Sequence, residues 1–303
     1  VVISVTDILE WDFNMKLTGM PIETFTDDRT LEFLCDEGIT LSVSSFSLPE
    51  LDIDHLKRVA GYSNNKICLW HETRNDLVTC VDDEYELLYR QLSLCAGLGI
   101  EVESLFLNYE GPMNQTYNRD LRLTRYQKLS RNRAQCRARN RLATLHNQVI
   151  WWAAGPHYDF YGYPGNRKIR LIKDYLWTGY EEGLIPSLMV YNPLRLDACE
   201  MALQAALELG IEVIPCFTLY GGYKGSYTDS DHWHQNEHWQ ANGTETPPTF
   251  NYHTNWTVAM AKMFNRYPRI TEGVMYSIPA IKKRVQLNWL RHYSAWKATI
   301  NKR

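Results

Sequence analysis

The sequence lacks the features that mark several broad classes of protein. No apolar run in it approaches the ~20 residues that span a lipid bilayer. Its 32 lysines and arginines nearly balance its 35 aspartates and glutamates, which gives a formal net charge of −3. Nucleic-acid binders and membrane-surface binders carry a strong basic excess, so we expect neither nucleic acid nor membrane as a partner. Small neutral partners fit this charge balance better than phosphate polymers do.

The sequence also has little that suggests a metal or a cofactor. Its seven cysteines form no close-spaced metal or redox pattern, and Cys80 and Cys95 are candidates for a disulfide that spacing alone does not decide. No glycine-rich phosphate fingerprint follows the first predicted strand. His234 and His238 are four residues apart, but they lie in a segment predicted to be a loop and have no third ligand at diagnostic spacing. We therefore predict no cofactor and no metal.

Short β-like runs alternate with helical patterns along the whole chain, and this alternation is typical of repeated βα units around a parallel sheet. The chain has 303 residues and is 45% hydrophobic, enough for one large core. Eight such runs predict a single (β/α)8 TIM barrel over residues 1–303. The predicted strands are Val2–Thr6, Ile39–Ser44, Lys66–Trp70, Val102–Asn108, Gln148–Ala153, Ser187–Tyr191, Glu212–Leu219 and Gly273–Ser277.

Two of the intervening helices are plain in the sequence. Residues Asp82–Leu98 and Leu194–Leu209 repeat apolar side chains at intervals of three and four. Each pattern ends in a glycine that leads into the next strand, where a left-handed helix cap is expected. The same role is predicted for all the glycines that precede strands in this way: Gly38, Gly99, Gly183, Gly210 and Gly273.

The segments after the strands are longer than those before them, most of all residues 7–26 after the first strand and 220–251 after the seventh. In a parallel barrel the carboxyl ends of the strands carry the chemistry. Aromatic residues make up 13% of the chain, and flat rings among polar groups suit the faces of sugars. We predict an oligo- or polysaccharide substrate and a set of residues that bind it at the strand ends: Asp7, Trp70, Glu72, Trp152, His157, Asn192, Tyr220 and Tyr276.

The fourth predicted strand ends in the most informative pair. Asn108 and Glu110 close an apolar run, and side chains two residues apart on a strand lie on one side, ~6–7 Å apart. Tyr109 and the Gly111-Pro112 turn flank Glu110. A carboxyl group with apolar neighbours has a raised pKa, which suits a general acid. Glu110 is therefore the leading candidate for an acid or base.

Three short motifs resemble the chitinase-type glycoside hydrolases, which are (β/α)8 barrels. Their fourth strand ends in Asp-x-Glu, the sixth carries Met-x-Tyr-Asp and the eighth reads Gly-x-Met-x-Trp. This chain has Asn108-Tyr109-Glu110, Met189-Val190-Tyr191-Asn192 and Gly273-Val274-Met275-Tyr276 on the matching predicted strands. With Asn in place of the first Asp, the Asn-x-Glu sequence resembles that of the endo-β-N-acetylglucosaminidases, barrel enzymes that use an asparagine for the same task. The chain departs from the chitinase-type pattern at Phe106 and Ser104, where that family has further aspartates, and at Tyr276 and Ser277, near its Trp.

The resemblance implies substrate-assisted hydrolysis of an N-acetylhexosamine-containing glycan, in which the 2-acetamido oxygen of the sugar attacks the anomeric carbon. By this resemblance Glu110 protonates the leaving oxygen and later activates water. Asn108 orients the acetamido group, and Tyr191 donates a hydrogen bond to its carbonyl oxygen.

Two other functions fit the same residues. A retaining or inverting glycosidase would pair Glu110 with a second carboxylate, Glu72, at the neighbouring strand end. A catalytically inactive glycan-binding barrel would keep the aromatic cleft and lose the chemistry. Residues 119–141 carry nine basic residues and one acid, which indicates a solvated helix face or a local anionic partner.

Three Asn-x-Thr sequons favour a secreted or extracellular glycoprotein. They begin at Asn114, Asn242 and Asn255, in or beside segments that are predicted to be loops.

Overall fold

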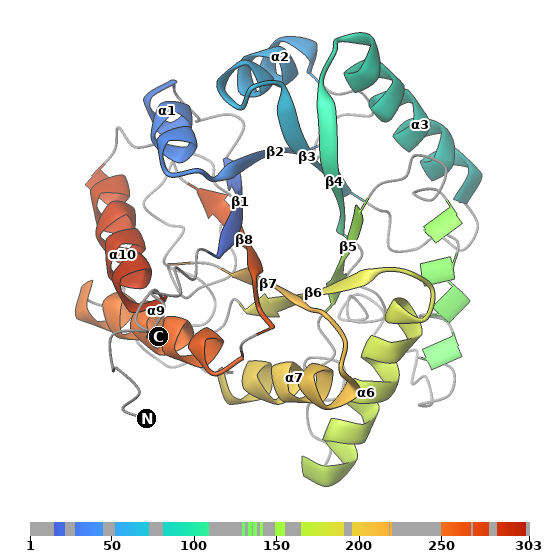
Figure 1. The fold of residues 1–303 in the computed structure, drawn as a ribbon, viewed down its shortest axis with the longest axis vertical. Coiled ribbons are helices and arrows are strands. Elements are labelled where there is room, and N and C mark those ends of the chain that lie inside the picture. Colours follow the sequence, from blue (N-terminus) through green and yellow to red (C-terminus); the bar gives the residue numbers. More distant parts are fainter. Residues whose placement is uncertain are drawn as a thin grey trace, which may run out of the picture.

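A computed structural model shows that eight strands form one closed parallel barrel in the order in which they occur along the chain. The predicted TIM barrel is thereby confirmed (Figure 1). The structure describes residues 15–21, 28–44, 52–72, 81–108, 149–154, 165–190, 196–217, 219, 250–267, 269–278 and 284–300, together with 129–130, 133–134, 136–137 and 140–141.

Every strand pairs in parallel with its two neighbours, and β1 closes the barrel against β8. Because a closed sheet has no edge, each described strand has a hydrogen-bonded neighbour on both sides. The strands are β1 Lys16–Pro21, β2 Thr40–Ser44, β3 Lys66–Glu72, β4 Glu101–Asn108, β5 Val149–Ala154, β6 Ile185–Val190, β7 Ile214–Phe217 and β8 Glu272–Ile278.

Helices surround the barrel and cover its outer face (Figure 1). Among the described helices, none is long and apolar enough to cross a membrane. The helices are α1 Asp28–Asp36, α2 Ile53–Tyr62, α3 Val81–Gly97, α6 Gly165–Tyr180, α7 Leu196–Leu209, α9 Phe250–Asn265 and α10 Arg284–Ile300.

The first strand is not where the sequence predicted it. Lys16–Pro21 forms β1, inside the segment expected to be a long loop, whereas Val2–Thr6 lies outside the described residues. Val2–Thr6 is rich in β-branched residues, while β1 contains Gly19 and Pro21, which weaken a strand. The register of β1 with β8 and β2 closes the barrel, so tertiary pairing outweighs local propensity here.

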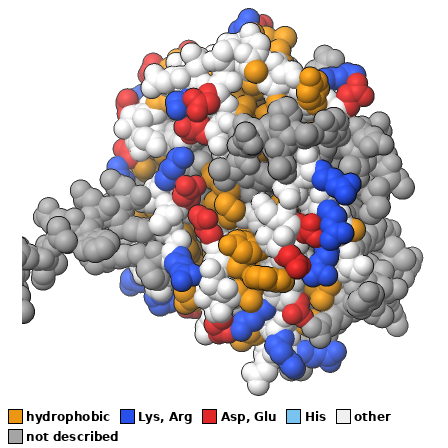
Figure 2. All heavy atoms as spheres, turned by 45° about the vertical axis from the view of Figure 1, so that its right-hand side comes forward, with side chains coloured by type: hydrophobic (Ala, Val, Ile, Leu, Met, Phe, Trp, Pro, Cys, Tyr) orange, Lys and Arg blue, Asp and Glu red, His pale blue; other side chains and the backbone are white. Residues whose placement is uncertain are grey.

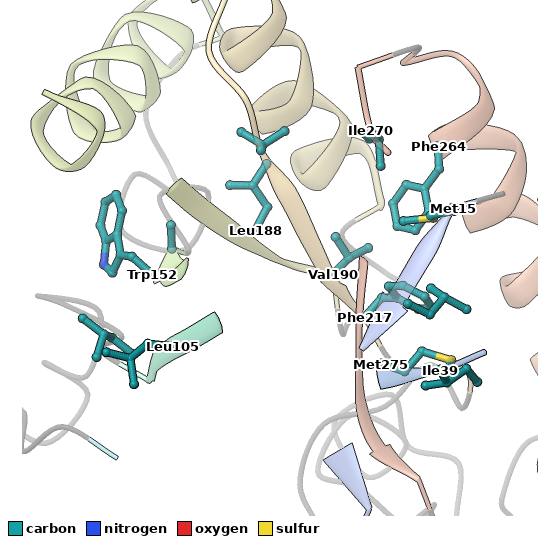
Figure 3. Close-up of a cluster of buried hydrophobic side chains, with 14 of the residues drawn as sticks. Met15, Ile39, Leu105, Trp152, Leu188, Val190, Phe217, Phe264, Ile270 and Met275 are labelled. Atoms are coloured by element: carbon teal, nitrogen blue, oxygen red, sulfur yellow. The ribbon is translucent and has the colours of Figure 1, made fainter. Parts of the chain in front are cut away.

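The apolar core has two layers, because alternate residues of each strand point into the barrel and toward the helices. The inner layer includes Cys68, Trp70, Phe106, Trp151, Ala153, Met189, Ile214, Cys216 and Val274. The outer layer packs strand residues such as Leu105, Trp152, Leu188, Val190, Phe217 and Met275 against the helices (Figure 3). Strands such as β5 and β7 are therefore apolar on both faces, as expected for a parallel barrel, whereas β2 turns the polar Ser42 inward beside Cys68.

The helix-capping role predicted for five glycines is confirmed at four of them. Gly38, Gly99, Gly183 and Gly210 have φ values of 69°, 72°, 85° and 70°, the left-handed region that glycine adopts without strain. The prediction is wrong for Gly273, which lies within β8. A Cβ there would stand 2.3 Å from Cε of Met15 and 3.0 Å from Cε1 of Phe217. Gly273 therefore serves close packing rather than a turn.

Two expectations about modification and disulfides also change. The sequon at Asn255 lies in α9 rather than in a loop, and its Thr257 is buried and donates a hydrogen bond of 3.0 Å to the carbonyl oxygen of Leu219. The other two sequons lie outside the described residues. Cys95 is a free thiol, so the candidate bridge with Cys80 is not formed.

Charged side chains gather at the amino-terminal end of the barrel. Val102 pairs with Ile67 and Ser104 with Cys68, so Glu103 is an extra residue in β4. Its carboxylate lies 4.0 Å from Nζ of Lys16 and 3.6 Å from Nζ of Lys66. Burial raises the pKa of the nearby Glu272 carboxyl. These contacts are at the end of the barrel opposite to the predicted site, where stability rather than chemistry is expected.

Candidate functional site

The carboxyl ends of β3 and β4 bring two of the predicted site residues into one layer. Glu72, the last residue of β3, is the register partner of Asn108, the last residue of β4. Adjacent strands are ~4.8 Å apart, so the two backbones are immediate neighbours at the mouth of the barrel. Asn108 is half-buried. The chain then continues from Asn108 into Tyr109 and Glu110, which lie outside the described residues.

An aromatic layer lies directly below this pair. Trp70 and Phe106 are register partners two residues before Glu72 and Asn108. Their rings stack with centroids 3.9 Å apart and an interplanar angle of 20°. Trp70 is 1% exposed and Phe106 is 0% exposed. Phe106 is in turn the register partner of Trp151 on β5, which also belongs to the inner layer. Three large rings from β3, β4 and β5 therefore exclude water from this side of the interior.

The same burial makes the thiol of Cys68 unreactive. Cys68 lies below Trp70 on β3, and burial raises the pKa of its thiol to about 12. A thiol with that pKa stays protonated at neutral pH, and the thiolate is the form that attacks or binds metals. Among the described residues, no group of three or more His, Cys, Asp or Glu side chains could hold a metal ion. The described inner layer thus offers packing, and a TIM barrel is expected to carry its functional residues at the rim above it.

Several predicted site residues fall where the structure gives no description. Six of them lie outside the described residues: Asp7, Glu110, His157, Tyr191, Asn192 and Tyr220. Tyr276 lies in β8, and Tyr191 directly follows the last residue of β6. Strands β3 and β4 thus end at a predicted site residue, and β6 ends immediately before one. The roles assigned to these residues stay predictions.

The placement of Trp152 corrects the predicted binding set. Its side chain belongs to the outer layer between the barrel and α6, where it stacks on Tyr175 at 5.4 Å (Figure 3). Trp152 is 0% exposed, and the side chain of its neighbour Trp151 occupies the interior instead. Two adjacent tryptophans on a strand point to opposite faces, so only one of them can face the barrel interior. Trp152 is therefore a core residue.

Trp70 also differs from its predicted role. It does face the barrel interior, but it is covered below the rim rather than open to a ligand. Phe106 and Trp151 were not predicted as site residues. A signal for Phe106 was present in the alternation along β4, because Phe106 is two residues before Asn108 and therefore shares its face.

The basic run after β4 is partly neutralised by carboxylates. Nη2 of Arg133 lies 3.0 Å from Glu181, and Nη2 of Arg137 lies 2.8 Å from Glu182. The Arg137 guanidinium lowers the pKa of the Glu182 carboxyl. On the face drawn in Figure 2, basic and acidic side chains are intermingled rather than separated by sign. The described part of this run favours the solvated helix face over an anionic partner.

A groove of about 520 Å³ lies outside the barrel, between α1 and α10. Its lining residues are Phe33, Glu37, Leu290, Tyr293, Ser294, Lys297 and Ala298. Both Tyr293 and Lys297 donate to Oε2 of Glu37. The lining comes from α10, α1 and Glu37, which directly follows α1, so this groove is separate from the strand ends where the barrel site is predicted.

No protein-family model matches the sequence, and no curated protein matches it either. Solved structures with the same fold include an endo-1,4-beta-xylanase from Caldicellulosiruptor owensensis, with a TM-score of 0.51 and 10% identity over 89% of this chain and 87% of that one. A thermostable mutant of a xylanase from Cellvibrio japonicus has a TM-score of 0.51 and 9% identity over 89% of this chain and 88% of its own. At such identities these similarities show the barrel fold and leave the reaction open.

Proposed function

We propose that this protein is a glycoside hydrolase that cleaves an N-acetylhexosamine-containing glycan with the help of the substrate's own acetamido group. Glu110 is the general acid and base, Asn108 orients the acetamido group, and Tyr191 donates a hydrogen bond to its carbonyl oxygen. The proposal rests on the three motifs that resemble the chitinase-type and endo-β-N-acetylglucosaminidase-type enzymes.

The observation that carries the proposal is the register of β4 in a closed barrel. Asn108 is the last residue of the strand and has the inward parity of Phe106, so the Asn-x-Glu sequence begins at the mouth of the barrel. In TIM-barrel enzymes the active site lies at this end. The same sequence at the other end of a strand, or one residue out of phase, would not support the proposal.

The chemistry needs one acid and one orienting amide. The acid proton of Glu110 passes to the glycosidic oxygen as the bond from that oxygen to the anomeric carbon breaks. The acetamido oxygen forms the new bond to the anomeric carbon, and the resulting ring is opened by water, whose proton returns to Glu110. A positioned acid contributes about 10²–10⁴-fold and orientation several kcal/mol more. The neutral amide of Asn108 suits the orienting task because it does not titrate.

A second candidate is favoured by the position of Glu72. As the register partner of Asn108 it ends the strand next to β4, so it could serve as the second carboxylate of a two-carboxylate glycosidase. Retaining enzymes hold the two carboxyl groups ~5–5.5 Å apart and inverting enzymes ~6.5–9.5 Å apart. The acetamido mechanism ranks first because the motif residues at strands 4 and 6 include both partners that an acetamido group needs.

A matched pair of substrates tests the proposed function. Chromogenic glycosides and oligosaccharides of N-acetylglucosamine are compared with the glucose equivalents, which carry a hydroxyl in place of the acetamido group. We expect kcat/KM to be at least about 100-fold higher for the N-acetyl substrates, since only they supply the nucleophile. Chitin, peptidoglycan, N-glycan and hyaluronan fragments then identify the natural linkage. Equal hydrolysis of both members of the pair would overturn the acetamido mechanism.

A further inference from the structure

The layer beneath the proposed catalytic residues is aromatic, and it lies on the same two strands as the residues at the rim. Trp70 and Phe106 occupy one register step of β3 and β4, and Glu72 and Asn108 occupy the next inward step toward the mouth. The two rings stack at 3.9 Å and 20°, an arrangement held by the two strands that also carry the rim residues. Any tilt between the ends of these strands would disturb the stack.

The residues below Asn108 on its own face of β4 are Phe106 and Ser104, both buried. Neither of them ionises at neutral pH, so the face of β4 beneath Asn108 carries no charge. The rings of Trp70, Phe106 and Trp151 form the layer beneath Asn108, which we call the aromatic floor. This floor is rigid, because aromatic rings have few rotamers and protein interiors are close-packed. On the far side, Trp151 of β5 continues the same layer.

We propose that Trp70 and Phe106 are positioning residues, whose stack fixes the strand end that presents Asn108 to the substrate. This inference rests on the proposed function. Neither ring is open to a ligand, because Trp70 is 1% exposed and Phe106 is 0% exposed. At Phe106 and Ser104, where the chitinase-type pattern has further aspartates, this chain has an aromatic ring and a hydroxyl group. The consequence is that a change in the floor alters the rate of the chemical step and leaves substrate binding intact.

The chain offers a closely matched control for this inference. Phe217 on β7 is also fully buried and also stacks on a tryptophan, Trp296, with centroids 5.4 Å apart at 25°. It belongs to the outer layer, however, and packs against Phe264 of α9. Phe106→Leu and Phe217→Leu thus remove the same atoms from two equally buried strand positions. A purely structural role predicts the same kinetic outcome for both.

The test compares kcat and KM of the two variants on the preferred N-acetyl substrate. We expect Phe106→Leu to lower kcat by about 10- to 100-fold at unchanged KM, because small misplacements of catalytic groups have effects of that size. Phe217→Leu is expected to stay within about twofold of the wild-type kcat, although both variants melt at a lower temperature. If both variants keep the wild-type kcat, or both lose it equally, the positioning role is overturned.

If Phe106→Leu does not fold, a second pair of variants tests the positioning role. Trp70→Phe keeps a ring against Phe106 and is expected to retain at least about a third of the wild-type kcat, whereas Trp70→Leu is expected to lose about 10-fold or more. Equal kcat values for these two variants would contradict the inference. A wild-type protein that cleaves no N-acetyl substrate would instead overturn the proposed function itself, and the two failures are therefore distinguishable.

Discussion

Replacing Glu110 by Gln is expected to lower kcat by about 10²–10⁴-fold while substrate binding persists. The amide keeps the size and much of the hydrogen bonding of the carboxyl group, but it has no proton to give to the leaving oxygen. The measurement is kcat on a chromogenic N-acetyl substrate, together with the dissociation constant of an unhydrolysed oligosaccharide by calorimetry. Turnover of Glu110→Gln at the wild-type rate would show that Glu110 is not the general acid.

The matched variant Glu72→Gln separates the three functions considered for this barrel. The acetamido mechanism predicts that Glu72→Gln keeps most of the wild-type kcat. A two-carboxylate glycosidase predicts that it loses as much activity as Glu110→Gln does. A glycan-binding barrel predicts no hydrolysis by the wild type and little change in binding for either variant.

The second large effect concerns stability, and it is expected at Gly179. This glycine of α6 faces Trp152 so closely that a Cβ would lie 2.1 and 2.4 Å from two atoms of the indole ring. Trp152 is fully buried against Tyr175 and cannot move aside without repacking the outer layer. Overpacking costs ~1–3 kcal/mol, and we place Gly179→Ala at the upper end, a fall in Tm of roughly 5 °C for a chain of this size. Thermal unfolding followed by circular dichroism measures it.

Gly61 of α2 provides the control for that substitution. It is exposed, and a Cβ there would meet no atom within 4 Å. Since glycine costs roughly 0.5–1 kcal/mol relative to alanine inside a helix, Gly61→Ala is expected to raise stability slightly. A Gly179→Ala protein as stable as Gly61→Ala would show that α6 does not approach the barrel as closely as the structure has it.

The barrel was predictable because its signals are local and repeated. Strands β2 to β8 coincide with apolar runs in the sequence, and the junctions after α3 and α7 carry the same Leu-Gly-Ile-Glu-Val sequence. Four of the five glycines predicted to cap helices have the left-handed conformation that such a junction requires. β1 was missed because closure of the barrel, a contact between distant parts of the chain, selects Lys16–Pro21.

Only those features of the site that follow from the alternation of side chains along a strand were predictable. The sequence pattern correctly predicted Asn108 at the carboxyl end of β4. It did not assign the inward and outward faces of Trp151 and Trp152, because both faces of a parallel barrel strand are apolar and the sequence does not tell them apart. For the same reason the stack of Trp70 on Phe106, which depends on the register between two strands, is visible only in the structure.

The most direct test of the acetamido mechanism is inhibition of the wild-type protein by a sugar-fused thiazoline, which mimics the cyclic intermediate formed by the acetamido group. We predict competitive inhibition with an inhibition constant at least about 100-fold below the KM of the matching substrate, as expected for a mimic of the reacting state. Full hydrolysis of the N-acetyl substrate in the presence of saturating thiazoline would contradict it.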